Sequence, residues 1–309
     1  MQRRSFLITA STLAASLFEA HWLAATTPGS QWLAQEDLVL DGDRRLARRA
    51  LLLLPRQRQG VEELPLLVLL HGLGETSDEK LGIHAWGERY GLVSSYERLR
   101  CPPVGQTLNK VKYLTDDYLS ELNASLRRRA FSPMALLCPF TPNVYKLPPA
   151  DQALDRYADW LDTILLPAVR KRAPVALHRE RTALDGCSLG GYVGLEVFLR
   201  KPHLFGSWGG VQAALGQSAA DRYADRIAAV VEGQATAVRL GTSTGDPYRK
   251  ANERLSRALT KHGIPHTLSI HPGPHNQPWL REVGTLSMLL WHDRVWGNRT
   301  AQSRTPVRG

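Results

Sequence analysis

The sequence predicts an α/β fold with a mostly parallel central sheet and helices on both faces. Short apolar runs, each bounded by Pro or Gly, indicate buried strands, and they alternate with segments of helical periodicity. The 309 residues are 43% hydrophobic and 22% charged, which excludes disordered, collagenous and coiled-coil chains. Three scattered cysteines are too few for a disulfide framework or a Cys-rich zinc site.

Continuous apolar runs define the expected strands. The strongest are Leu66–Leu70, Met134–Cys138 and Thr182–Leu184, which end at His71-Gly72, at Pro139 and shortly before Gly186. Weaker patterns predict strands at 207–213, 235–240 and 266–270, and antiparallel edge strands within 26–64, around 39–40 and 51–54.

Helical periodicity lies between these runs. Apolar residues from Leu154 to Ala168 recur at spacings of three and four, which predicts a helix over about 151–172. Further helices are expected at 190–200, 248–262 and 276–296, the last interrupted near Gly284. The layout of the long insertion at 75–130 is not predicted. No repeat or linker divides the chain, so one domain is expected over 26–296.

The first residues have the character of an export signal. Arg3-Arg4 precede a short apolar stretch that ends at Glu19 and is too short to span a bilayer. With Ser5-Phe6-Leu7, the arginine pair resembles a bacterial twin-arginine signal. An ordinary secretory signal and an amphipathic start of a cytoplasmic protein are the alternatives. We expect removal of residues 1–25, a periplasmic or secreted protein, and no stable membrane anchor afterwards.

The chain is basic, with 39 Lys+Arg against 29 Asp+Glu, a formal charge of +10. Its arginines gather in short runs, and a basic, flexible tail is expected over 297–309. Such runs could follow nucleic acid or another anionic surface. Two of them fall at predicted helix ends, where cations favour the helix dipole and stay solvated. Because no nucleic-acid-binding motif accompanies the charge, no nucleic-acid partner is expected.

Gly186-Cys187-Ser188-Leu189-Gly190 lies between a predicted strand and a predicted helix. A Gly-x-Ser-x-Gly turn in that context forms a nucleophile elbow, which exposes the serine oxygen at the helix start. A tight glycine turn with a capping serine is the alternative. The sequence therefore predicts Ser188 as a nucleophile.

A serine hydroxyl needs a base at neutral pH, and histidine is suited to that task. In elbows of this kind the partners follow along the chain as acid and then histidine. His275, after the Pro272-Gly273-Pro274 loop, is the expected base, and His271 at the strand end is the competitor. A metal site from these two histidines is not expected, because the prolines prevent the helix that would align them.

The acid should follow the penultimate strand. Asp246, in Gly245-Asp246-Pro247, fits that position and would orient the imidazole. The same residue could instead cap the next helix, and Asp225 and Glu253 are weaker candidates. For the oxyanion hole we expect the backbone amides of Leu189, after the nucleophile, and Leu73, after the strand at 66–70.

Together these motifs resemble the α/β-hydrolase superfamily, in particular its putative esterase (esterase D-like) branch. The likeness covers about residues 60–292 and depends on the segments 71–74, 186–191, 245–246 and 272–275, followed by Trp279. That branch includes enterochelin, feruloyl and polyhydroxyalkanoate esterases and mycolyltransferases. Pro274 departs from it, because glycine is common there.

The resemblance implies hydrolysis of a small-molecule or polymer-linked carboxylic ester through an acyl-enzyme on Ser188, with no metal or organic cofactor. Trp279 would either wall the pocket or staple its helix, and Cys187 would pack without reacting. The alternatives are an acyltransferase with the same triad and a non-catalytic binding protein on a hydrolase scaffold.

Overall fold

Eight strands form one sheet, in the order β1-β2-β4-β3-β5-β6-β7-β8. The computed structural model describes residues 30–58, 60–108 and 111–304. β2 pairs antiparallel with β1 and β4, and the pairs among β3 to β8 are parallel. The strands are β1 (Leu33–Val39), β2 (Arg49–Pro55), β3 (Leu66–Leu70), β4 (Ala135–Pro139), β5 (Thr182–Gly186), β6 (Ser207–Val211), β7 (Ala237–Gly245) and β8 (His266–Pro274). The predicted α/β architecture is confirmed.

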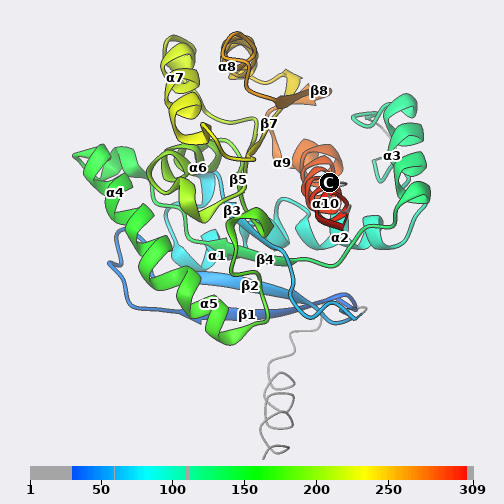
Figure 1. Cartoon of the computed structure of the whole chain (residues 1–309), viewed down its shortest axis with the longest axis horizontal. Helices are drawn as coiled ribbons and strands as arrows, with labels where there is room; N and C mark the ends of the chain where they lie inside the picture. The colour runs from blue at the N-terminus through cyan, green and yellow to red at the C-terminus, as the bar shows by residue number, and fades with distance from the viewer. Residues whose placement is uncertain (1–29, 59, 109–110, 305–309) are drawn as a thin grey trace, which may run out of the picture.

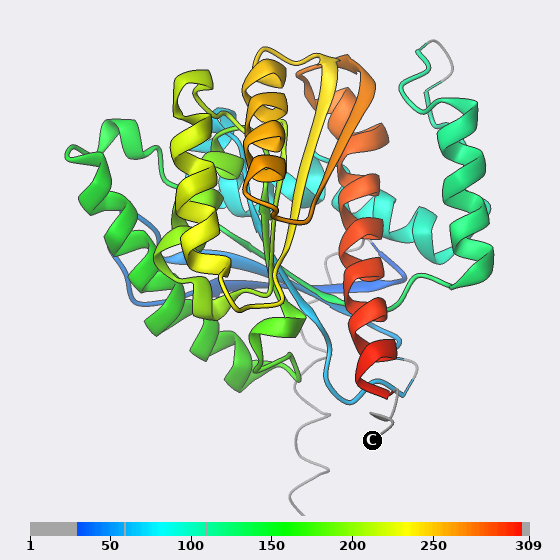
Figure 2. The ribbon, with the colours of Figure 1, turned by 45° about the horizontal axis from the view of Figure 1, so that its top comes forward.

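Helices cover both faces of this sheet (Figures 1 and 2). On one face α4, α6, α7 and α8 pack in succession, and on the other α2 packs against both α1 and α10. The helices are α1 (Glu79–Glu88), α2 (Leu92–Arg100), α3 (Asp116–Arg128), α4 (Ala150–Trp160), α5 (Leu166–Arg172), α6 (Leu189–Arg200), α7 (Ala220–Val231), α8 (Arg249–Lys261), α9 (Gln277–Trp279) and α10 (Thr285–Arg304). The two layers explain why β3 and β4 are apolar throughout, since every residue of both strands is buried.

The predicted helix at 151–172 is interrupted by a π-helical turn. This turn (Leu161–Leu165) separates α4 from α5 without ending the helical path. A second π-helical turn (Leu280–Gly284) precedes α10, at the interruption predicted near Gly284. The insertion at 75–130, whose layout was not predicted, contains α1, α2 and α3.

The carboxyl end of the domain lies beyond the predicted boundary at residue 296. Helix α10 continues to Arg304 instead of giving way to a tail. Arg299 donates hydrogen bonds of 2.7 to 2.9 Å to the carbonyl oxygens of Glu180, Gly206 and Ala235, so this part of the helix is held against the domain. The predicted export signal and the last five residues lie outside the described residues. Among the residues described, no helix is long and apolar enough to cross a membrane.

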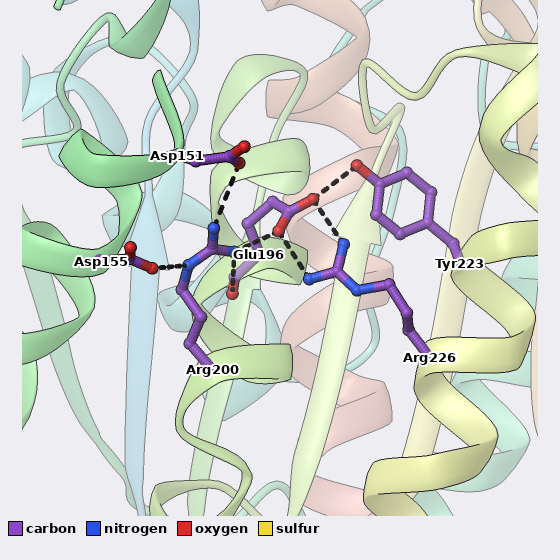
Figure 3. Close-up of polar contacts among 6 residues, drawn as sticks. All are labelled: Asp151, Asp155, Glu196, Arg200, Tyr223 and Arg226. Carbon is purple, nitrogen blue, oxygen red and sulfur yellow. Dashed lines mark hydrogen bonds and ion pairs between the residues drawn. The ribbon is translucent and has the colours of Figure 1, made fainter. Parts of the chain in front are cut away.

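A buried carboxylate joins three helices on one face of the sheet (Figure 3). Glu196 of α6 accepts hydrogen bonds from Tyr223 (2.7 Å) and Arg226 (2.9 and 3.0 Å) of α7. It also pairs with Arg200, one turn further along α6, and Arg200 in turn reaches Asp155 of α4 at 2.7 Å. Because α6 begins at the predicted nucleophile, this network fixes the helix that carries Ser188.

Glu196→Gln is expected to reduce the free energy of unfolding by about 1–3 kcal/mol at pH 7. This is less than the roughly 3–5 kcal/mol typical of breaking a fully buried ion pair, because the Arg226 side chain still reaches water. Burial raises the pKa of Glu196, but hydrogen bonds from Arg226 and Tyr223 lower it more, so the net pKa lies below its usual value.

The pH dependence of this difference follows from that lowered pKa. A carboxyl with a lowered folded-state pKa stabilises the protein fully above its unfolded-state pKa, and the contribution is lost as pH falls through the folded-state value. The difference between wild type and variant in urea unfolding should therefore be largest at pH 6–8 and shrink below about pH 4. An equal difference at pH 7 and pH 4 would contradict this account.

Candidate active site

A strained turn between β5 and α6 presents Ser188. Its φ of 53° and ψ of −117° lie outside the regions that non-glycine residues normally occupy. The flanking glycines leave no room for a side chain: a Cβ on Gly186 would lie 2.4 Å from the Gly190 carbonyl oxygen, and one on Gly190 would lie 2.2 Å from that of Leu70. The turn is held by backbone hydrogen bonds from Cys187 to Leu70 (3.1 Å) and from Ser188 to Val211 (3.0 Å). This is the geometry predicted for a nucleophile elbow.

The structure brings Ser188, His275 and Asp246 together. The Nε2 of His275 lies 3.1 Å from the Oγ of Ser188, and its Nδ1 lies 2.9 Å from the Oδ1 of Asp246. An acid that accepts from Nδ1–H leaves Nε2 as the acceptor for the serine proton. The residues come from the carboxyl ends of β5, β7 and β8, which meet at one edge of the parallel sheet.

Asp246 is buried and oriented by its own partners. Its side chain has no exposed area, whereas that of His275 is 27% exposed. Thr242 donates to its Oδ2 at 2.5 Å, and the backbone amide of Tyr248 donates to Oδ1 at 3.0 Å. Asp246 therefore contacts the imidazole of His275 and binds the amide of Tyr248, the residue before α8.

The competing candidates lie elsewhere. His271 packs edge-on against Tyr118 at 4.5 Å between ring centroids, and burial together with the nearby Arg239 lowers its pKa to about 4. Asp225 pairs with His262 at 2.9 Å, and Glu253 pairs with Arg249 at 3.5 Å. None of these three residues forms a hydrogen bond or ion pair with Ser188 or His275 within the described part of the chain, so the geometry favours His275 and Asp246.

The loop that carries His275 is fixed by Trp279. The indole Nε1 of this buried residue donates to the carbonyl oxygen of Pro272 at 3.0 Å, and its backbone amide donates to the Asn276 side chain at 3.0 Å. Gly273 has a φ of 129° and lies so close that a Cβ on it would approach the Trp279 ring to 2.4 Å. Trp279 therefore staples the loop and the start of its helix, which is one of the two roles considered from the sequence.

The two backbone amides predicted for the oxyanion hole, those of Leu73 and Leu189, both lie at the start of a helical turn. Leu189 is the first residue of α6, so its amide has no acceptor within the helix. Leu73 begins a short 3₁₀ turn directly after His71-Gly72, and neither amide has a protein acceptor among the described residues. His71 supports this loop: its Nε2 accepts from the Thr141 amide at 2.8 Å, and its Nδ1 donates to the Gly72 carbonyl oxygen at 2.9 Å. Burial lowers the pKa of His71 to about 4, which keeps the ring neutral for both contacts.

Solved structures of similar architecture establish the fold. A ferulic acid esterase superposes with a TM-score of 0.61 at 17% identity, covering 85% of this chain and 98% of that one. The S-formylglutathione hydrolase of Staphylococcus aureus gives 0.57 at 15% identity, with 87% and 100% covered. This chain has the α/β-hydrolase fold. The fluorophosphonate-binding serine hydrolase F of Staphylococcus aureus is similar to the same extent, with a TM-score of 0.58, 15% identity, and 86% and 99% covered. No protein-family model matches the sequence, and no curated protein matches it significantly.

Within this α/β-hydrolase fold, Gln212 is a residue near the site that sequence analysis did not find. It follows β6 with a φ of 49°, and its side-chain amide donates to Ser243 at 2.7 Å and to the Pro274 carbonyl oxygen at 3.1 Å. It thereby fixes the backbone immediately before His275. Its position after a strand of the parallel sheet was the only sequence signal, and many loop residues share it.

Cys187 lies beside the nucleophile without being exposed. Its side chain is buried, and burial, followed by the charge of Glu75, raises the pKa of its thiol well above the usual value. A thiol is a nucleophile as the thiolate. The raised pKa therefore supports a packing role for Cys187, as expected from the sequence.

Proposed function

We propose that the protein is a serine hydrolase that cleaves carboxylic esters through an acyl-enzyme on Ser188. The observation that carries the proposal is the continuous hydrogen-bonded series Ser188–His275–Asp246, at 3.1 and 2.9 Å, on a strained elbow. Structural neighbours with the same fold include a ferulic acid esterase and an S-formylglutathione hydrolase, which supports the reaction class.

The proposed reaction has two steps. The Oγ of Ser188 attacks the ester carbonyl carbon while Nε2 of His275 takes its proton, and Asp246 stabilises the imidazolium. The tetrahedral oxyanion binds the amides of Leu73 and Leu189. The intermediate then collapses, the alkoxide leaves with the proton from His275, and Ser188 carries the acyl group. In the second step His275 takes a proton from a water molecule, which attacks the acyl-enzyme, and this proton passes to the Oγ of Ser188 as the free acid is released.

One exposed and two partly exposed tyrosines support a proposed entrance for the substrate beside His275. Tyr248 packs edge-on against His275 at 5.6 Å, and the ring of Tyr145, which is 65% exposed, stacks on that of Tyr192 at 5.8 Å. The substrate is proposed to be a small-molecule or polymer-linked ester.

The basic and apolar start of the chain supports export to the periplasm or the medium.

The test combines a covalent probe with product analysis. The purified chain is treated with a fluorophosphonate, and the modified peptide is identified by mass spectrometry. Phosphonylation of Ser188, together with release of free acid from p-nitrophenyl acetate, is the expected result. No labelling and no hydrolysis of p-nitrophenyl acetate or of short-chain, aryl and feruloyl esters would contradict the proposal.

A further inference from the structure

Glu75 is a buried carboxylate directly behind the proposed oxyanion loop. It ends the 3₁₀ turn that Leu73 begins, and it is only 2% exposed although it is an acid. A buried carboxylate is costly unless it is paired and hydrogen-bonded, so its position implies a set of partners. Neither the triad nor the two amides of the proposed mechanism requires this residue.

Tyr90 connects Glu75 to the backbone of the loop. Its hydroxyl donates to the Oε2 of Glu75 and accepts a hydrogen bond from the amide of Gly72 at 3.2 Å. A carboxylate can only accept, so it fixes the single hydroxyl proton toward itself and leaves the oxygen lone pairs for the Gly72 amide. Gly72 immediately precedes Leu73, and the Glu75–Tyr90 pair therefore determines the orientation of the peptide next to the oxyanion amide.

The second carboxylate oxygen faces the loop that carries the base. The Nε2 of Gln277, two residues after His275, donates to the Oε1 of Glu75 at 3.3 Å. Arg89 lies 3.5 Å from the same oxygen and supplies the opposite charge, with its own side chain 41% exposed. Glu75 thus connects two loops: through Tyr90 it reaches the proposed oxyanion loop, and through Gln277 it reaches the loop that carries His275. Glu75 and Gln277 are 202 residues apart in the sequence.

We propose that Glu75 is a positioning residue, which sets the oxyanion amide of Leu73 relative to His275 through Tyr90 and Gln277. The inference rests on the proposed ester hydrolysis and adds a residue to it. Electrostatics alone gives the opposite expectation, because a negative charge near a developing oxyanion destabilises the transition state. If Glu75 does not position the Leu73 amide, removing its charge should accelerate the reaction. If Glu75 does position that amide, removing the charge should slow the reaction.

The test compares Glu75→Gln and Tyr90→Phe with wild type. Each variant should lower kcat for p-nitrophenyl acetate by about 10- to 100-fold and leave KM within about twofold, since complete loss of one oxyanion donor costs about 100- to 1,000-fold. Affinity for 2,2,2-trifluoroacetophenone, whose serine adduct carries an oxyanion, should fall in the same proportion as kcat/KM. If Glu75 and Tyr90 only stabilised the fold, the affinity for the ketone would not fall in proportion to kcat/KM.

Glu282→Gln is the matched control. Glu282 is 1% exposed, accepts from the Thr107 amide at 2.9 Å and pairs with Arg98 at 3.4 Å. Its replacement removes an equally buried carboxylate, so it should lower the unfolding midpoint without changing kcat or affinity for the ketone. Tyr90→Phe, which keeps the ring, tests the same contact if Glu75→Gln does not fold.

Two outcomes would overturn the inference while leaving the proposed function intact. One is an active wild type whose Glu75→Gln and Tyr90→Phe variants keep kcat and ketone affinity within twofold. The other is a faster Glu75→Gln variant. An inactive wild type that no fluorophosphonate labels would instead contradict the proposed function, and the inference with it.

Discussion

Ser188→Ala is expected to lower kcat/KM for p-nitrophenyl acetate by about 10⁴- to 10⁶-fold, and His275→Ala by a similar factor. The two residues act as one unit, because the serine reacts only as its proton passes to Nε2 of the imidazole 3.1 Å away. The double variant should therefore be no slower than either single variant. Fluorophosphonate labelling should disappear with Ser188→Ala.

A second serine–histidine pair provides the control. The Oγ of Ser256 lies 2.7 Å from Nε2 of His266, a contact as short as any in the proposed triad. That pair joins α8 to the start of β8, and the other ring nitrogen of His266 lies 2.9 Å from the carbonyl oxygen of Ile264, where the proposed triad has a carboxylate. Ser256→Ala should keep kcat/KM within about threefold. Multiplicative losses in the Ser188/His275 double variant, or an equal loss with Ser256→Ala, would show that Ser188 and His275 do not act together.

The proposed triad could be found from sequence because each member has a local signature. The elbow needs glycines at 186 and 190 for steric reasons that hold for any such turn, and the order of acid and base along the chain follows from the order of the strands. Parallel strands place their carboxyl ends at one edge of the sheet. Three residues at such ends can therefore meet although 87 residues separate Ser188 from His275.

The supporting contacts had no such signature. Glu75 and Tyr90 meet because a loop packs against the second residue after α1, and no periodicity in the sequence predicts that contact. Gln212 is recognisable only through its backbone φ of 49° and its buried amide. The sequence identified the groups proposed to react, whereas the groups that hold them depend on tertiary packing.

The fold shows the same division. The central strands β3 and β4 are apolar on both faces and were predicted, but α7 was missed, although its buried residues Ala220, Tyr223, Ala224 and Ile227 recur at helical spacing. The end of the last helix was predicted too early because the basic residues after 296 are typical of a flexible tail. The structural role of Arg299 is visible only in its hydrogen bonds to three carbonyl oxygens.

Gly190→Ala is expected to destabilise the protein by about 3 kcal/mol or more and to abolish hydrolysis. A Cβ on Gly190 would lie 2.2 Å from the Leu70 carbonyl oxygen and 2.6 Å from that of His71, which are backbone atoms of β3 and of the proposed oxyanion loop. Neither can yield without moving Ser188 or Leu73. The free energy of unfolding would be measured in urea alongside kcat/KM.

Gly194→Ala is the matched control for Gly190→Ala, because it is the same substitution one turn further along α6. A Cβ at Gly194 has its nearest neighbour, Nε1 of Trp208, at 3.5 Å, an ordinary contact. Alanine favours helix over glycine by about 1 kcal/mol, so this variant should be equally stable or more stable and fully active. Helix propensity predicts the same gain at both positions, and only the packing of α6 against β3 predicts opposite signs. A Gly190→Ala protein as stable and active as Gly194→Ala would mean that the elbow is looser than the structure indicates.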